Sequence, residues 1–299
     1  MHRNPSSRRI ALAMVVTVAS TVVVTVAALV GCTPSIQNRL PRGDWEVAAS
    51  GVVHGTELRY LTLAGTAYAS PAEPALDRLL HFLDEVGPAW RMPERIDYYA
   101  FPDRETLRAL TGWDTNGRAI LAHDATTSIH AADAHEVMHV LTTPTARPLR
   151  LGGLWMEGVA MYYTWPEVYF DAATLAERGL PPRLGAWYGR TVHGNAQEAR
   201  ANGELPSLTP LAHGNQAFFA LPDGITYPAA GSFVTHLLGA GHGDLERIAA
   251  FRAFLDDANA AADTAAVLAA FERHMGVTLA DAEAAWHAFL DDWDESAAE

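Results

Sequence analysis

The residues best suited to chemistry in this chain are His135, Glu136 and His139, which form the pattern H-E-x-x-H. On an α-helix, side chains four residues apart lie on the same face, so the two imidazoles can hold one metal ion between them. Glu136 stands one residue along, where its carboxylate can accept a proton from a metal-activated water. The pattern predicts a Zn²⁺ site with a general base beside it.

Glu157 is the predicted third metal ligand. A catalytic zinc site takes three protein ligands and keeps an open fourth position for water. The segment Val140–Met156 contains no His, Asp, Glu or Cys, so Glu157 is the first possible ligand after it. Apolar residues recur at helical spacing over Leu154–Tyr162, which predicts a second buried helix. Gly158 within it favours close approach of another backbone, which we expect to be the H-E-x-x-H helix.

The order of these residues separates two classes of zinc hydrolase. The metzincin pattern requires Gly and His three and six residues after the second histidine, where this chain has Thr142 and Thr145. HEVMH followed by W-M-E-G-V-A instead resembles the gluzincin metallopeptidases, which include the thermolysin-like and aminopeptidase N-like enzymes. The resemblance is closer to the bacterial peptidase MA-like domains and covers about residues 90–292.

The family pattern continues with a Tyr-containing A-G-S-F-V helix and a terminal helix that carries a Trp, matched here by Tyr227–Val234 and Glu283–Trp286. The resemblance implies a thermolysin-like zincin core that hydrolyses peptide bonds with a zinc-activated water and Glu136 as general base. It also implies a strand along the cleft whose exposed edge holds an extended peptide. One Zn²⁺ per chain is expected, with the protein ligands His135, His139 and Glu157.

Two features depart from the aminopeptidase N-like pattern. Seventeen residues separate His139 from Glu157, where those enzymes usually have eighteen, a difference that a loop absorbs. The signature G-x-M-E-N, with which those enzymes hold the N-terminus of a substrate, is absent ahead of the metal motif. The sequence therefore leaves open whether the activity is that of an endopeptidase or an exopeptidase.

Tyr227 is the predicted donor to the oxyanion of the transition state. It stands at the start of the expected helix Ala229–Leu238, where the aminopeptidase N-like enzymes place their transition-state tyrosine. The alternative is a tyrosine that only packs on a neighbouring helix. Tyr162 and Tyr163, on the helix of the third ligand, point away from the metal face because they are five and six residues beyond that ligand.

Residues 1–31 are predicted to be a lipoprotein signal peptide. A basic start with three arginines is followed by the uncharged, apolar run Ile10–Val30. Cys32, the only cysteine, follows Leu-Val-Gly as in a bacterial lipoprotein cleavage box, and we expect it to be lipidated. The alternative is an uncleaved membrane anchor. In both cases the catalytic part is expected in the cell envelope, on the extracytoplasmic face of a bacterial membrane.

The charge of the chain restricts its partners. All 21 basic residues are arginine, and without residues 1–31 the chain has 18 of them against 35 acidic residues, a net charge of −17. Such acidity disfavours nucleic acid and anionic lipid surfaces. A peptide or protein substrate is expected. The alternative function is a catalytically weak, zinc-stapled envelope protein that binds a partner or assists assembly.

The predicted fold class is α+β, with a tether (residues 32–44), a small mixed-sheet lobe (45–129) and a mainly helical lobe (130–299) that carries the zinc site. Strands are expected at Val52–His54, Leu58–Leu63, Ile96–Phe101, Ala119–His123 and Thr126–Ile129. Helices are expected at Pro74–Val86, Arg104–Thr111, Ala229–Leu238, Leu245–Leu255, Ala262–His274 and Leu279–Trp293. The expected caps are Asp103, Asp257, Asp263 and Thr278, with Gly112 and Gly276 at C-terminal ends.

The segment Pro181–Thr226, rich in Gly and Pro, is expected to be irregular and to contribute to substrate selection. Six aromatic residues in or before this segment could line a pocket, but core packing is the expected role of most of them: Trp165, Tyr169, Trp187, Tyr188, Phe218 and Phe219. Among the other histidines only His123 is a candidate to point into the cleft. His130 is expected at the entry to the helix or in the cleft wall.

Overall fold

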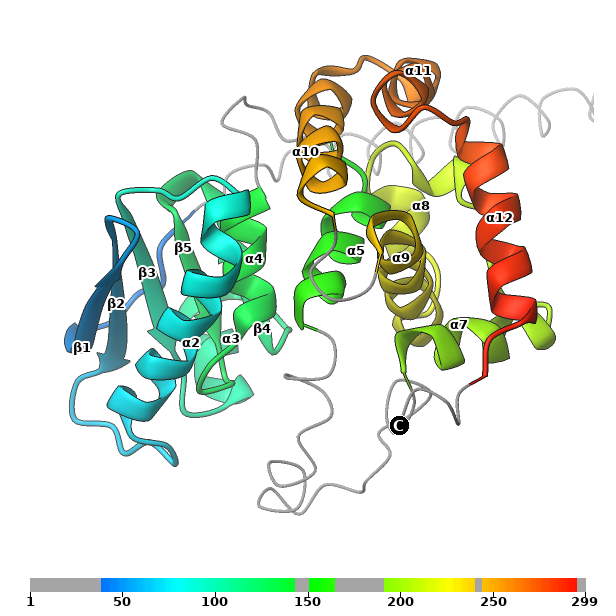
Figure 1. The fold of residues 1–299 in the computed structure, drawn as a ribbon. Coiled ribbons are helices and arrows are strands. Elements are labelled where there is room, and N and C mark those ends of the chain that lie inside the picture. The colour runs from blue at the N-terminus through cyan, green and yellow to red at the C-terminus, as the bar shows by residue number, and fades with distance from the viewer. Residues whose placement is uncertain (1–38, 143–150, 165–190, 240–243, 295–299) are drawn as a thin grey trace, which may run out of the picture. The chain divides into compact units, whose positions relative to one another are not determined.

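The computed structural model describes residues 39–142, 151–164, 191–239 and 244–294 (Figure 1). The chain divides into Met1–Arg39 and one compact unit, Leu40–Glu299, which contains all the elements below. The predicted signal peptide and Cys32 lie outside the described residues, as do Trp165, Tyr169, Trp187, Tyr188 and His242. Among the helices of the described part, none has the length and apolarity that a membrane crossing requires.

Five strands form a mixed sheet in the order β1-β2-β3-β5-β4. The antiparallel pair β1 (Trp45–Val53) and β2 (Thr56–Leu63) is joined by His54 and Gly55, which both have positive φ, as a tight two-residue hairpin requires. β3 (Arg95–Ala100) runs parallel to β2 and to β5 (Ala125–Ser128). β4 (Gly117–Ile120) is antiparallel to β5 and is the outer strand at the edge opposite β1.

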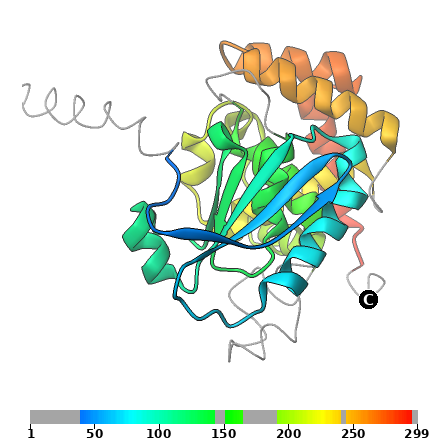
Figure 2. The same ribbon diagram turned by 90° about the vertical axis from the view of Figure 1, so that its left-hand side faces the viewer.

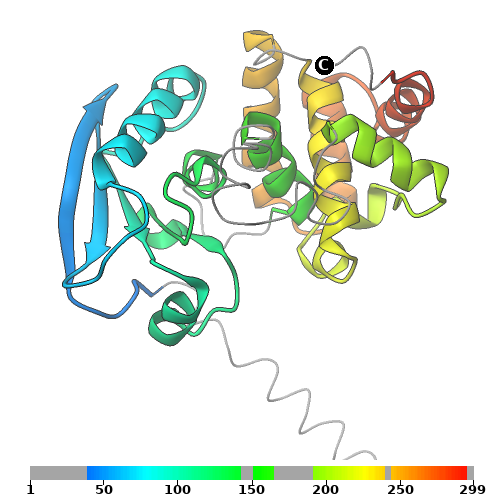
Figure 3. The same ribbon diagram turned by 90° about the horizontal axis from the view of Figure 1, so that it is seen from below.

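Helices pack on both faces of the sheet. α2 (Ala72–Val86) and α4 (Ala134–Thr142) lie on the face that looks toward the helical region, as Figure 3 shows. The second face carries a smaller apolar cluster, to which α3 (Arg104–Thr111) contributes; Figure 2 views the sheet from the side of β1, with α3 beside it. Along each strand, side chains point alternately to the larger apolar core on the first face and to this smaller cluster on the second. Neighbouring residues of β4 therefore also face opposite sides of the sheet.

All the named strands precede α4, and the described residues after it are mainly helical. The helices that follow are α5 (Gly153–Thr164), α7 (Val192–Ala201), α8 (Gln216–Phe219), α9 (Asp223–Leu238), α10 (Leu245–Ala260), α11 (Thr264–Met275) and α12 (Leu279–Asp291). The predicted α+β class, a small mixed sheet followed by a mainly helical region, is confirmed.

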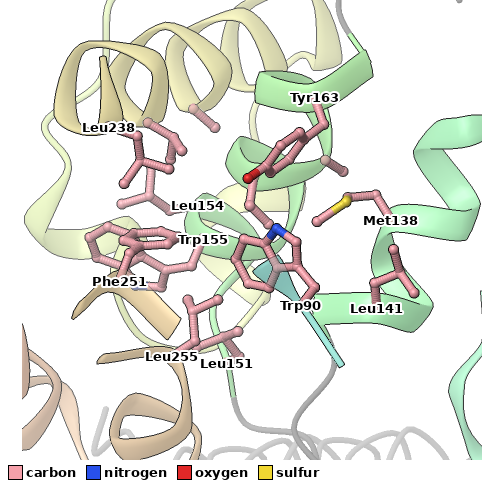
Figure 4. Close-up of a cluster of buried hydrophobic side chains, with 14 of the residues drawn as sticks. Trp90, Met138, Leu141, Leu151, Leu154, Trp155, Tyr163, Leu238, Phe251 and Leu255 are labelled. Atoms are coloured by element: carbon pink, nitrogen blue, oxygen red, sulfur yellow. The ribbon is translucent and has the colours of Figure 1, made fainter. Parts of the chain in front are cut away.

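A continuous apolar core joins α4 to α5. Trp155 of α5 is fully buried, with its ring centroid 4.7 Å from that of Phe254 and 5.5 Å from that of Phe271. Its indole N–H donates to the carbonyl of Ala212 at 2.8 Å. Figure 4 shows Trp90 between α4, represented by Met138, and the residues of α5. Since interiors pack densely, this core fixes the distance between the two helices that carry the candidate ligands.

Several predicted strand and helix boundaries were wrong. β1 begins at Trp45, seven residues before the predicted Val52, and ends at Val53. Leu121–His123 form a short 3₁₀ helix (η3) and not the end of a strand, because the chain turns there, through Asp124 at φ 46°, to pair β5 with β4. α9 begins six residues before the predicted Ala229. α10 continues past Asp257, which is therefore no cap; its carboxylate pairs instead with Arg273 and His274 of α11.

The segment Pro181–Thr226 was also predicted wrongly in part. It contains all of α7 and α8 and the first residues of α9, although residues 181–190 lie outside the described part. The Thr191 hydroxyl caps α7 by accepting the Gly194 N–H, a local signal that the density of Gly and Pro obscured.

Candidate metal centre

Hydrogen bonds to the sheet fix the first turn of α4, which carries His135 and Glu136. The Asp133 carboxylate, buried just before the helix, accepts the Ser128 hydroxyl at 2.6 Å and the Glu136 N–H at 3.4 Å. The Tyr98 hydroxyl accepts the Asp133 N–H at 2.9 Å. Asp133 therefore acts as an N-cap that ties the helix to β3 and β5.

Glu157 comes from α5, which packs against α9 through Gly158. A Cβ at Gly158 would lie 2.6 Å from the Val234 side chain and 2.8 Å from the carbonyl oxygen of Ala230, both in α9. The close approach that Gly158 predicts is thus with α9, and the expectation that it is with the H-E-x-x-H helix was wrong. Bulky side chains such as Met138 and Trp90 lie on the α4 side of α5 instead (Figure 4).

The structure brings the three predicted ligands together. His135 Nε2 lies 3.1 Å and His139 Nε2 lies 3.3 Å from Glu157 Oε2, and the two nitrogens are 3.2 Å apart. All three side chains are buried. In the described part of the chain, His135, His139 and Glu157 form a group of three side chains whose donor atoms could hold a metal ion.

The triangle of donor atoms fits zinc. Zn–N and Zn–O bonds of about 2.0–2.1 Å in a tetrahedron place ligand atoms about 3.3–3.4 Å apart, close to the observed edges. Two imidazoles and one carboxylate are also the donors that zinc takes in catalytic sites, and three protein ligands leave a fourth position for water. The donor set therefore supports a catalytic rather than a structural zinc site.

The charges of the site favour an ionised ligand carboxylate. Burial opposes ionisation of Glu157, but His139 and His135 outweigh it and lower the pKa of Glu157 to about 2. Burial also opposes the charged form of His139, yet contact with Glu157 raises the pKa of His139 to about 9. Without metal, His139 and Glu157 therefore form a buried ion pair whose proton a metal ion must displace.

Zinc binding is expected to release about one proton per chain between pH 7 and 8.5, since His139 must become neutral to bind the metal. The apparent affinity should rise with pH up to about 9, the pKa of His139 in the metal-free protein. Calorimetric titrations of zinc in buffers with different ionisation enthalpies measure the proton count. An observed heat that does not depend on the buffer would show that His139 is already neutral.

Glu136 lies beside the ligands and has a proton affinity suited to a base. Burial, the largest influence, raises the pKa of Glu136 to about 7, although His139 acts in the opposite direction. The outer strand packs directly on this residue. A Cβ at Gly117 of β4 would lie 3.0 Å from Glu136 Cγ and 3.1 Å from its Oε1. Glycine at 117 thus allows the strand to approach the predicted base.

Tyr227 also lies at the site, within α9 and not at its start. Its ring centroid is 6.3 Å from that of His135 and 5.6 Å from that of Phe218 in α8. The structure therefore places Tyr227 beside a predicted ligand and also packs it on a neighbouring helix, so both sequence alternatives describe part of its environment. Tyr162, as expected, faces elsewhere: its hydroxyl donates to the Gly239 carbonyl at 3.0 Å.

Neither His123 nor His130 belongs to the group of candidate ligands. His123 is exposed on η3, and His130 precedes α4, where its carbonyl accepts the Tyr98 hydroxyl. Sequence reasoning missed Asp133, although an Asp just before a helix is a capping signal. It also missed Gly117, whose contact with Glu136 joins residues from two elements and leaves no local pattern.

Among comparisons with known proteins, only the search of solved structures finds proteins similar to this chain. No protein-family model matches the chain, and no curated protein matches it. A mutant of the M1 zinc metallopeptidase from Deinococcus radiodurans is 15% identical with a TM-score of 0.46, over 81% of this chain and 51% of that one. Another structure of that metallopeptidase is 16% identical with a TM-score of 0.41, over 83% of this chain and 51% of that one. The chain spans about half the length of these proteins.

Proposed function

We propose that this chain is a zinc-dependent metallopeptidase with a gluzincin-type site. The observation that carries the proposal is the convergence of His135, His139 and Glu157 within 3.1–3.3 Å of one another, with Glu136 beside them. One zinc ion per chain follows from one such group in the described residues.

A base beside the metal favours catalysis over a purely structural role. Structural zinc sites usually have four ligands and are rich in cysteine, whereas here three ligands leave a position for water. Glu136 is not a member of the ligand group, and partial burial of its carboxylate raises its pKa to about 7. A protein that used zinc only as a staple would have no need of such a group at this position.

The proposed mechanism assigns one task to each residue. A zinc ion held by His135, His139 and Glu157 would supply Lewis acidity and would lower the pKa of the attacking water to near 7. Glu136 accepts the proton of the attacking water and passes it to the nitrogen of the leaving amine. His135 and His139 act as neutral imidazoles and Glu157 as a carboxylate. The Tyr227 hydroxyl donates a hydrogen bond to the oxygen on which negative charge develops.

β4 is proposed to position the substrate. In the described residues it pairs with β5 alone, so one edge of its backbone is not used within the sheet. An extended peptide can pair with such an edge through main-chain hydrogen bonds. Because Gly117 of β4 contacts Glu136, a peptide held at this edge passes close to the base.

The proposed location is the extracytoplasmic side of a bacterial membrane, with Cys32 lipidated. Support comes from the sequence: the basic start, the apolar run and the position of the single cysteine. The substrates would then be peptides or proteins of the cell envelope. The negative net charge of the chain after residue 31 is consistent with a protein held near the membrane by its lipid and not by charge.

Purified protein is expected to contain about one zinc per chain and to cut a peptide library in a manner that a chelator stops and zinc restores. Elemental analysis measures the metal, and mass spectrometry of the digest, with the Glu136→Gln protein as blank, measures cleavage. Internal cuts define an endopeptidase and terminal cuts an exopeptidase. Protein without stoichiometric zinc contradicts the site, and zinc-loaded protein that cuts nothing favours the binding-protein alternative.

A further inference from the structure

Arg118 is a half-buried cation in the outer strand β4, next to Gly117. Within the described residues no carboxylate forms an ion pair with its guanidinium. Asp114, the nearest acidic residue in the sequence, is instead paired with Arg104, with 3.1 Å between Nε and Oδ1. A cation that is partly removed from water and is not part of an ion pair is a group that an anionic ligand can satisfy.

Stacking on Trp113 holds the guanidinium of Arg118 in place. Its central carbon lies 4.8 Å from the centroid of the Trp113 ring, which is itself buried. Ile120, two residues along β4, packs in the same cluster as Trp113. Arg118 therefore faces the side of the sheet that carries this cluster, while Gly117 faces Glu136 on the other side. A stacked guanidinium keeps its donors free for a planar anion.

Arg118 is also close enough to the predicted catalytic centre for its charge to be felt there. Burial lowers the pKa of Arg118, while the negative charge of Glu136 raises it. Arg118 directly follows Gly117, where a Cβ would lie 3.0 Å from Glu136 Cγ. A peptide paired with β4 places every second side chain on the face of Arg118, within a few residues of the bond next to Glu136.

We propose that Arg118 forms a carboxylate subsite, which binds an acidic side chain or the free C-terminal carboxylate of a peptide laid along β4. The proposal rests on the peptidase function proposed above and specifies the class of its substrates. The guanidinium offers two parallel N–H donors to the two oxygens of a carboxylate, a geometry that an amide cannot match. Its half-buried position reduces the screening that weakens exposed ion pairs.

The test compares cleavage of matched peptides that differ by one carboxylate. One set has Glu or Gln at each position within three residues of the cut bond, and the other has a free or an amidated C-terminus. The wild-type kcat/KM is expected to favour one carboxylate-bearing peptide by about 10- to 100-fold, the worth of a charge-assisted hydrogen bond. Arg118→Gln should bring this ratio close to one. Arg108→Gln, which removes an exposed arginine of α3, is the matched control and should keep the wild-type ratio.

Binding measurements separate the subsite from the peptidase function. The same peptides are titrated into zinc-loaded Glu136→Gln protein with and without Arg118→Gln. Carboxylate-dependent binding that requires Arg118 supports the subsite even if the wild type cleaves no peptide, in which case only the peptidase proposal fails. A wild-type ratio of one in both assays overturns the subsite. So does a ratio that Arg118→Gln leaves unchanged while it lowers Tm, since Arg118 would then only pack on Trp113.

Discussion

Glu136→Gln is expected to lower kcat by about 10²- to 10⁴-fold and to leave one zinc per chain in place. Gln has nearly the same shape, so its contact with Gly117 persists, but its amide cannot accept the proton of the attacking water. The ligand triangle does not include Glu136, so metal affinity should change little. Steady-state kinetics on a peptide identified from the library digest, together with metal analysis, measure both quantities.

Glu136→Asp is the matched control because it keeps the carboxylate but withdraws it by one methylene. It should retain more activity than Gln while losing part of the wild-type rate, since a base must lie within hydrogen-bond reach of its proton. The pH profile adds a second readout. Without metal, burial raises the pKa of Glu136 to about 7. A bound metal cation favours the ionised carboxylate, so the midpoint of the acidic limb of wild-type kcat/KM should lie below pH 7. Equal rates for the Gln variant and the wild type would remove Glu136 from the mechanism.

Sequence patterns predicted best where the signal is local. The helix Arg104–Thr111 is found where it was predicted, with Asp103 accepting the Thr106 N–H and Gly112 at φ 80°. Asp263 and Thr278 likewise cap α11 and α12. The ligand group was also accessible, because two histidines four apart and a carboxylate on the next helix follow from helical spacing and a search for donors.

Features that depend on contacts between distant elements were not predictable. The sequence does not show which helix approaches Gly158, and that partner is α9. Asp257 has the residue type of a cap, but its ion pairs with α11 lie inside a longer helix. Arg118 belongs to no sequence motif. Its proposed role depends on the stacking on Trp113 and on the position of β4 at the edge of the sheet beside Glu136. Tertiary packing decides all three cases.

Tyr227→Phe is expected to lower kcat by about 10²- to 10³-fold, the usual effect of losing one donor to a developing oxyanion. The ring of Phe can keep the packing on His135 and Phe218, so the site and the helix α9 should be preserved. KM and zinc content should change little, because the lost hydrogen bond exists mainly in the transition state. Steady-state kinetics and metal analysis of the variant measure the three quantities.

Tyr162→Phe provides the matched control on the neighbouring helix α5. Its hydroxyl donates to the Gly239 carbonyl and does not face the ligands, so this variant should keep the wild-type kcat even if it loses some stability. The comparison separates the loss of a transition-state donor from the general cost of removing a phenol hydroxyl. An unchanged kcat in Tyr227→Phe would assign Tyr227 to packing between α8 and α9, and stabilisation of the oxyanion would then have to come from another donor beside the metal.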